Sequence, residues 1–203
     1  MIDHLVYATP NLEKTVAEIA AKWGVQPTPG GKHAGRGTHN ALVSFGTGSY
    51  LELIGPDPDQ PKTSSPMAFG IDELKAAKVV TWAAKAPGMQ ARVAAARTAG
   101  YDPGEPQAMS RDLPSGARLA WTLTRSTAGD GLVPFLIDWG ETTHPSTTSV
   151  GGCRLVSLRA VHLRPGEILA MLKALGEVLE VEEGPATALI AMVETPNGTF
   201  ELR

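Results

Sequence analysis

The beginning of the chain decides the fold, and residues 3–12 read Asp3-His4-Leu5-Val6-Tyr7-Ala8-Thr9-Pro10-Asn11-Leu12. The apolar run at residues 5–8 is typical of a buried strand, and the Thr-Pro-Asn that follows it is a turn sequence. From Leu12 to Trp23 apolar residues recur at helical spacing, and Gly24 ends that helix. We therefore expect a strand, a turn and an amphipathic helix whose apolar face includes Trp23.

The same order of elements recurs twice further along the chain. Opening strands are expected at residues 4–8, 79–84 and 154–163, each followed by a turn with proline, a helix and further strands. This pattern predicts an α+β fold built from repeated strand-helix-three-strand modules. The expected divisions are a first module at 1–56, a connection at 57–78, a second module at 79–140, a linker at 141–152 and a third module at 153–203.

The last strand of each module carries an acidic residue between two apolar ones. The three sequences are Leu51-Glu52-Leu53, Ile137-Asp138-Trp139 and Phe200-Glu201-Leu202. Because side chains alternate across a strand, the apolar pair faces one side of the sheet, toward the helix, and the acid faces the other side. The first module alone combines its acid, Glu52, with a histidine, His4, on its opening strand.

Four stretches of the sequence carry a resemblance to a known family. They are residues 3–12, Gly37-Thr38-His39-Asn40-Ala41-Leu42, Tyr50-Leu51-Glu52-Leu53-Ile54 and Pro134-Phe135-Leu136-Ile137-Asp138-Trp139-Gly140, the last followed by His144-Pro145. In these stretches the chain resembles the vicinal oxygen chelate superfamily, and within it the glyoxalase-like domain proteins. The resemblance implies that the first two modules pair side by side and enclose a glyoxalase-like cleft, with a third related module at the C-terminus.

The resemblance also implies a metal site in this cleft, with ligands on the first and last strands of each module. On this chain the implied ligands are His4, Glu52 and Asp138, and the divalent ion would be iron, manganese or zinc. The fourth position is Thr81, a poor ligand, so the alternative is a site without any metal. A shift of one residue along the strand of Asp138 would turn that side chain to the opposite face of the sheet.

Other residues of the same stretches are expected to contact the substrate or take part in the reaction. Glu52 and His39 are the candidate catalytic residues, with His39 as a proton shuttle, and Asn40 and Trp139 are expected to bind substrate. The alternative for His39 and Asn40 is that they cap the glycine-rich loop before them. His33 is expected in an exposed part of that loop.

Three functions remain open at this point, and one of them is a scaffold whose main activity is assembly. The first is a metal-dependent lyase, isomerase or dioxygenase that acts on a small carbonyl or diol compound. The second is a metal-free protein that binds or sequesters a small molecule in the same cleft. The sequence contains no glycine-rich phosphate-binding motif and no Gly-x-Ser-x-Gly nucleophile motif, so other common chemistries lack support.

Composition argues against several classes of partner. The chain has 18 Lys plus Arg and 21 Asp plus Glu, a formal net charge of −3, so we expect no nucleic-acid partner. No apolar run approaches the ~18 residues that cross a bilayer, and we expect a cytoplasmic protein without membrane contact. A third module of ~50 residues buries too little surface to stand alone. It is expected to form a homodimer through residues 153–203 or, alternatively, to pack against the first two modules.

Overall fold

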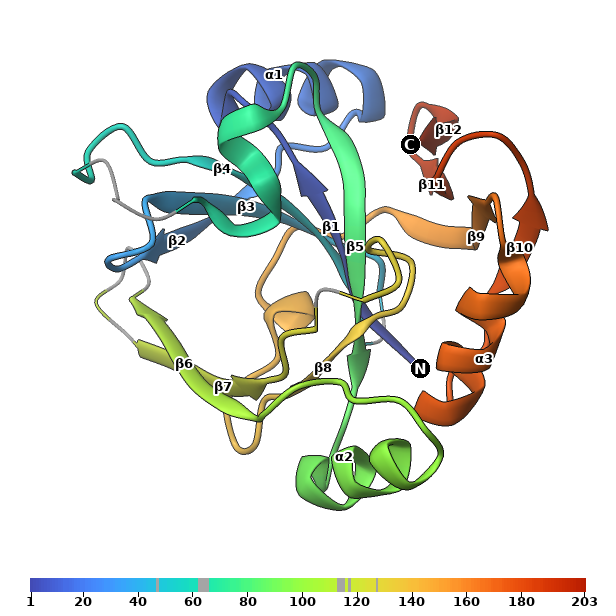
Figure 1. Ribbon diagram of the computed structural model, residues 1–203. Helices are drawn as coiled ribbons and strands as arrows, with labels where there is room; N and C mark the ends of the chain where they lie inside the picture. Colours follow the sequence, from blue (N-terminus) through green and yellow to red (C-terminus); the bar gives the residue numbers. More distant parts are fainter. Residues whose placement is uncertain (47, 62–65, 113–115, 117, 127) are drawn as a thin grey trace.

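The computed structural model describes residues 1–46, 48–61, 66–112, 116, 118–126 and 128–203 (Figure 1). The first module contains β1 (Ile2–Ala8), α1 (Leu12–Trp23), β2 (Thr28–His33), β3 (Thr38–Ser44) and β4 (Tyr50–Pro56). The second contains β5 (Lys78–Lys85), α2 (Met89–Thr98), β6 (Gln107–Asp112), β7 (Arg118–Leu123) and β8 (Phe135–Asp138). Two short 3-10 helices, η1 (Ala68–Glu73) and η2 (Pro145–Thr147), follow β4 and β8. The expected strand-helix-three-strand order is confirmed in both modules.

The eight strands of these two modules form one closed barrel in the order β1-β4-β3-β2-β6-β7-β8-β5. Within each module the opening strand pairs in parallel with the last strand, as β1 does with β4 and β5 with β8. The modules meet where β1 and β5 pair antiparallel, and a single residue pair, Lys32 with Asp112, joins β2 to β6 on the far side. The predicted side-by-side pairing of two repeated modules is therefore confirmed.

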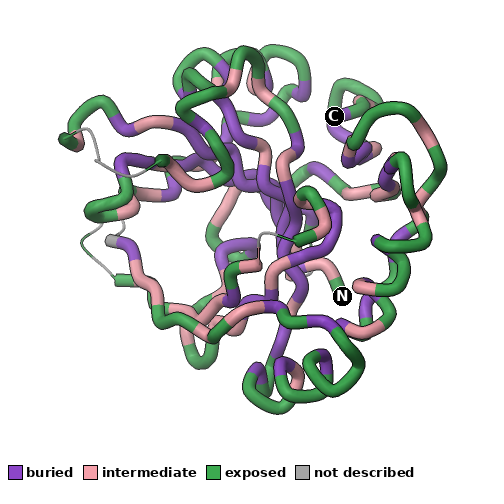
Figure 2. Tube along the Cα trace, viewed as in Figure 1, coloured by how far each residue is buried: buried purple, intermediate pink, exposed green. Residues whose placement is uncertain are grey.

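Side chains along each barrel strand point alternately to the helix layer outside and to the barrel interior. On β4, Leu51 and Leu53 are buried in the core cluster that also contains Leu12 and Ile19 of α1, while Tyr50 and Glu52 line the barrel interior. Figure 2 shows that the buried parts of the chain follow the central strands, while the outer faces of the helices are exposed. The acid on β4 is thus turned away from the helix, as its place between two leucines predicts.

Helix α1 begins and ends where its sequence indicates. The side chain of Asn11 accepts a hydrogen bond from the backbone N–H of Lys14 at 2.9 Å, and Gly24 ends the helix in the left-handed conformation with φ of 74°. Trp23 is buried, as expected from the helical spacing of its apolar neighbours. None of the helices that the structure describes is long and apolar enough to cross a membrane.

The variant Trp23→Ala is expected to lose about 3–5 kcal/mol of unfolding free energy, because it leaves a large cavity between α1 and the barrel. Urea unfolding of the purified protein measures the loss. The matched control Lys22→Ala removes an exposed side chain from the same turn and should cost less than about 1 kcal/mol. A Trp23→Ala effect as small as that of the control would contradict the packing of α1.

The third module has the same element order but a different strand pairing. It contains β9 (Arg154–His162), α3 (Pro165–Leu175), β10 (Glu180–Glu183), β11 (Ala188–Thr195) and β12 (Gly198–Leu202). Its sheet has the order β10-β9-β11-β12, so the opening strand β9 lies inside the sheet and pairs in parallel with the strand directly after the helix. In the first two modules the opening strand pairs instead with the last strand.

The third module packs against the second (Figure 1). Helix α3 contacts α2, and strand β11 contacts β5. The guanidinium of Arg92 on α2 donates to the Leu175 carbonyl at the end of α3 and pairs with Glu177, and the backbone N–H of Val79 donates to the Arg203 carbonyl at 2.8 Å. The module therefore packs against the rest of the chain, which was the expected alternative, and a homodimer through residues 153–203 stays a prediction.

Candidate functional site

The barrel encloses a cavity of about 1080 Å³ that both modules line. Most of its wall is apolar, and Phe135, Trp121 and Trp139 supply aromatic surface. The rings of Trp121 and Trp139 lie 5.2 Å apart between centroids. Polar side chains from five strands also line the cavity. They are His4 (β1), His33 (β2), Asn40 (β3), Glu52 (β4) and Arg111 (β6).

His4 is held in place by its sequence neighbour Asp3. The Asp3 carboxylate lies 2.7 Å from His4 Nδ1 and 3.0 Å from His144 Nε2, and it accepts a hydrogen bond from Trp139 Nε1 at 3.3 Å. Burial raises the pKa of Asp3, but the hydrogen bonds with His144 and His4 lower it by more, so this pKa lies well below its ordinary value. The ionised carboxylate accepts a hydrogen bond from His4 Nδ1, and Nε2 is the ring nitrogen that faces Glu52 and the cavity.

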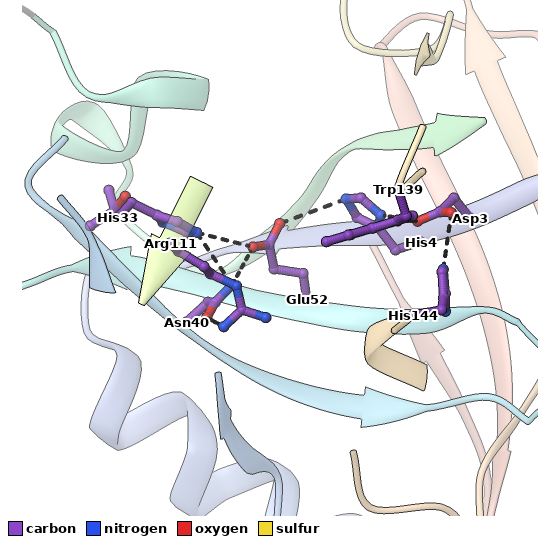
Figure 3. Close-up of polar contacts among 9 residues, drawn as sticks. Asp3, His4, His33, Asn40, Glu52, Arg111, Trp139 and His144 are labelled. Atoms are coloured by element: carbon purple, nitrogen blue, oxygen red, sulfur yellow. Dashed lines mark hydrogen bonds and ion pairs between the residues drawn. The ribbon is translucent and has the colours of Figure 1, made fainter. Parts of the chain in front are cut away.

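Glu52 lies between two histidines in the middle of the site (Figure 3). Its Oε2 atom is 3.8 Å from His4 Nε2, and its Oε1 atom is 3.8 Å from His33 Nε2. Oε1 also accepts a hydrogen bond from Asn40 Nδ2 at 2.5 Å. Burial lowers the pKa of His33 and outweighs the opposite effect of the Glu52 charge, so His33 is neutral near pH 7. The carboxylate therefore has polar neighbours on both sides and an apolar cavity beyond them.

Arg111 places a buried positive charge next to this carboxylate. It is only 3% exposed, and its Nη1 donates to the Gly30 carbonyl and, at 3.3 Å, to Asn40 Oδ1. The Asn40 amide thus accepts from Arg111 and donates to Glu52. A Cβ at position 30 would collide with Asn40 Oδ1 and lie 2.9 Å from Arg111 Nη1, so this close approach requires glycine.

Comparison with known proteins agrees with this architecture. The chain matches the glyoxalase-like domain family over residues 2–176. It belongs to that family. A hypothetical protein from Staphylococcus aureus has the same fold, with a TM-score of 0.68 and 15% identity over 98% of this chain and 84% of the other. The Streptomyces coelicolor methylmalonyl-CoA epimerase in complex with 2-nitronate-propionyl-CoA gives a TM-score of 0.47 and 23% identity over 70% of this chain and 96% of the other. A comparison with curated proteins finds no match.

The glyoxalase-like barrel brings four of the predicted site residues together. His4, Asn40, Glu52 and Trp139 all line the cavity. His39 does not line it, because its neighbours Thr38 and Asn40 face inward and His39 faces the helix side of the sheet. There its Nε2 lies 3.6 Å from Glu13 of α1, so the structure does not place His39 where a proton shuttle would need to be.

Asp138 also lies away from the cavity. Its carboxylate accepts the backbone N–H of Gly140 at 2.9 Å, and the cavity is lined instead by its neighbours Ile137 and Trp139. The strand register explains the difference. Glu52 pairs with Val6, two residues after His4, and the residue two after Thr81, Ala83, pairs with Phe135 on β8. The position of Glu52 in the first module therefore corresponds to Phe135 in the second, and Asp138, three residues further along, faces the opposite side of the strand.

The glyoxalase-like site therefore does not assemble the three metal ligands that the resemblance implies. His4 and Glu52 face each other and Thr81 also lines the cavity, but threonine is a poor ligand and Asp138 is turned away. Within the described part of the chain, no three His, Cys, Asp or Glu side chains are grouped so that they could hold a metal ion. The buried guanidinium beside Glu52 would also repel a cation. The residues present do not fit the expected metal site.

Three residues of this site were not predicted from the sequence. His33 is on strand β2 beside Glu52 rather than in an exposed loop. Arg111 reaches the site from β6, and no sequence motif around it indicates a role. Asp3 could have been found, because an acid adjacent to a candidate histidine is a common partner for the second ring nitrogen.

Proposed function

We propose that this glyoxalase-like protein binds a small carbonyl compound in the barrel cavity and that Glu52 and His4 transfer a proton to and from it. The observation that carries the proposal is the pair formed by His4 Nε2 and Glu52 Oε2, 3.8 Å apart, inside a cavity with mainly apolar walls. A carboxylate and an imidazole in such surroundings are the usual groups for general acid and base catalysis. An isomerisation needs no more than this proton transfer.

Each polar residue has a role in this reaction. Glu52 removes the proton from the carbon next to the substrate carbonyl, and the electron pair of that C–H bond moves onto the carbonyl oxygen. The guanidinium of Arg111 stabilises the resulting enolate oxygen, because a fixed positive charge in an apolar cavity acts strongly on a developing negative charge. Glu52 then passes this proton to His4 Nε2, while Asp3 keeps the imidazole ring oriented. His4 delivers the proton to the opposite face of the carbon as the enolate electron pair returns to that carbon, which gives the isomer and restores both residues.

Hydrogen exchange tests this proposal without knowledge of the physiological substrate. The purified protein is incubated in D₂O with a panel of small 2-oxo acids, 3-oxo esters and aryl ketones, and proton NMR follows the C–H signals next to each carbonyl. We expect accelerated loss of these signals with at least one compound class. Uniformly uncatalysed exchange across the panel would count against proton abstraction at this site.

The second candidate function is metal-free binding of an apolar molecule. The aromatic wall formed by Trp121, Trp139 and Phe135 favours it, since such walls bind flat apolar ligands. Tryptophan fluorescence reports on ligand entry because two of these residues are tryptophans. Saturable quenching by compounds that undergo no exchange would support this function over the enzyme.

A metal-dependent lyase or dioxygenase would need ligands beyond those that face the cavity. Elemental analysis of the purified protein measures how much iron, manganese and zinc is bound per chain. We expect less than stoichiometric metal, because only His4 and Glu52 of the implied set lie together and Arg111 lies beside them. One tightly bound ion per chain would favour the metal-dependent reaction.

A further inference from the structure

Two arginines converge at the mouth of the cavity. Arg36, in the turn between β2 and β3, and Arg125, directly after β7, both line the cavity and are both exposed to solvent. Nη2 of Arg36 lies 3.5 Å from the Sδ atom of Met109 on β6, and Nη2 of Arg125 lies 3.8 Å from the same atom. Because both contact one sulfur atom, the two guanidiniums are close enough for one small anion to touch both.

Among the residues that the structure describes, neither guanidinium has a counter-ion. Their shared partner is a thioether, which is a weak acceptor, and no carboxylate of the described residues lies within ion-pair distance of either. Elsewhere arginines pair with acids, as Arg92, Arg97, Arg154, Arg159, Arg164 and Arg203 do. Like charges this close repel each other, and burial together with the Arg36 charge lowers the pKa of Arg125.

The charged side chains that line the cavity are mostly positive, like the two arginines at its mouth. Its charged lining residues are the basic Arg36, Lys78, Arg111, Arg125 and Arg203 and the acidic Glu52 and Asp130. The cavity is therefore positive, although the chain as a whole has a net charge of −3. Such a concentration of one sign in a concave site attracts molecules of the opposite sign.

We propose that Arg36 and Arg125 form an anion-binding site that holds an acidic group of the ligand at the cavity mouth. This proposal rests on the proposed function, because it assumes that the ligand occupies the barrel. Guanidinium groups bind carboxylate, phosphate and sulfonate oxygens through paired N–H donors. The ligand is thus an acidic molecule whose apolar body lies against Trp121 and Trp139 and whose reacting end reaches Glu52. A cavity of about 1080 Å³ has room for such an extended molecule.

A matched pair of fluorescent probes tests the site. 8-Anilinonaphthalene-1-sulfonate and N-phenyl-1-naphthylamine share one aromatic skeleton, and only the first carries a sulfonate. We expect the wild-type protein to bind the sulfonate more tightly. The double variant Arg36→Gln/Arg125→Gln should weaken sulfonate binding about tenfold or more and leave binding of the neutral probe unchanged. The control Arg154→Gln, at an exposed arginine that begins β9 and pairs with Glu194, should change neither affinity.

The outcomes separate this inference from the function on which it rests. If the double variant binds both probes as the wild type does, the cavity binds ligands but the arginine site is refuted. If the wild type binds neither probe, binding in the barrel is refuted and the arginine site with it. Circular dichroism checks the fold of the double variant. Should it be unfolded, the single variant Arg125→Lys decides, because it keeps the charge, loses the paired donors and should weaken binding of the sulfonate alone.

Discussion

Replacement of Glu52 by glutamine is expected to slow the hydrogen exchange of any reactive carbonyl compound by a factor of about 100 to 10,000. Glutamine has nearly the same shape and still offers an oxygen to Asn40 Nδ2, which donates to Glu52 Oε1 at 2.5 Å. It cannot accept a proton from carbon. The measurement is the rate of C–H signal loss in D₂O for both proteins at equal concentration.

The control for this experiment is Asp138→Asn, which removes an acid from the last strand of the other module. Since Asp138 faces away from the cavity and binds the Gly140 N–H, this variant should exchange at close to the wild-type rate. The opposite result, a large loss with Asp138→Asn and little with Glu52→Gln, would mean that the register of β8 and the choice of base are both incorrect. Tryptophan quenching by the same compounds shows whether Glu52→Gln still binds them.

The sequence was sufficient to place Glu52 because its position depends on local rules. An acid between two leucines on a strand must face away from the apolar layer, and β4 obeys this rule. The same rule applied to Ile137-Asp138-Trp139 fails, because here the aromatic residue, Trp139, faces the cavity instead of the helix layer. The pairing of Ala83 with Phe135 determines which side chains of β8 face the cavity and which face the helix layer. This register is set by contacts between segments that are distant in the sequence.

Arg111 and His33 were beyond sequence reasoning for a related reason. Both reach the site only because β2 and β6 meet and close the barrel, where Lys32 pairs with Asp112 and Arg111 donates to the Gly30 carbonyl. The glycines before His33 predict a loop, yet β2 needs Gly30 so that Asn40 and Arg111 can approach its backbone. Similarly, the order of elements along the third module could be predicted from the sequence. Its strand order in the sheet could not, because that order depends on which strands pair with β9.

The variant Asp3→Asn is expected to lose about 3–5 kcal/mol of unfolding free energy near pH 7. Asp3 is 1% exposed and accepts hydrogen bonds from His4, His144 and Trp139. An asparagine amide would turn an N–H group toward one of these donors, and a buried donor without an acceptor is costly. Urea unfolding measures the loss. Asp102→Asn, at an exposed aspartate that pairs with Arg97, is the control and should have a much smaller effect.

The effect of Asp3→Asn should also depend on pH in a defined direction. The pKa of Asp3 in the folded protein lies below its ordinary value of 3.8, so its stabilising contribution is complete above that value and is lost as the pH falls toward the folded pKa. The difference between wild type and variant should therefore be largest near pH 7 and shrink measurably by about pH 2.5. A purely steric effect would give the same difference at both pH values. Hydrogen exchange of the carbonyl substrate should fall as well. Without the carboxylate the proton of His4 is free to move to Nε2, where the ring can no longer accept a proton from Glu52.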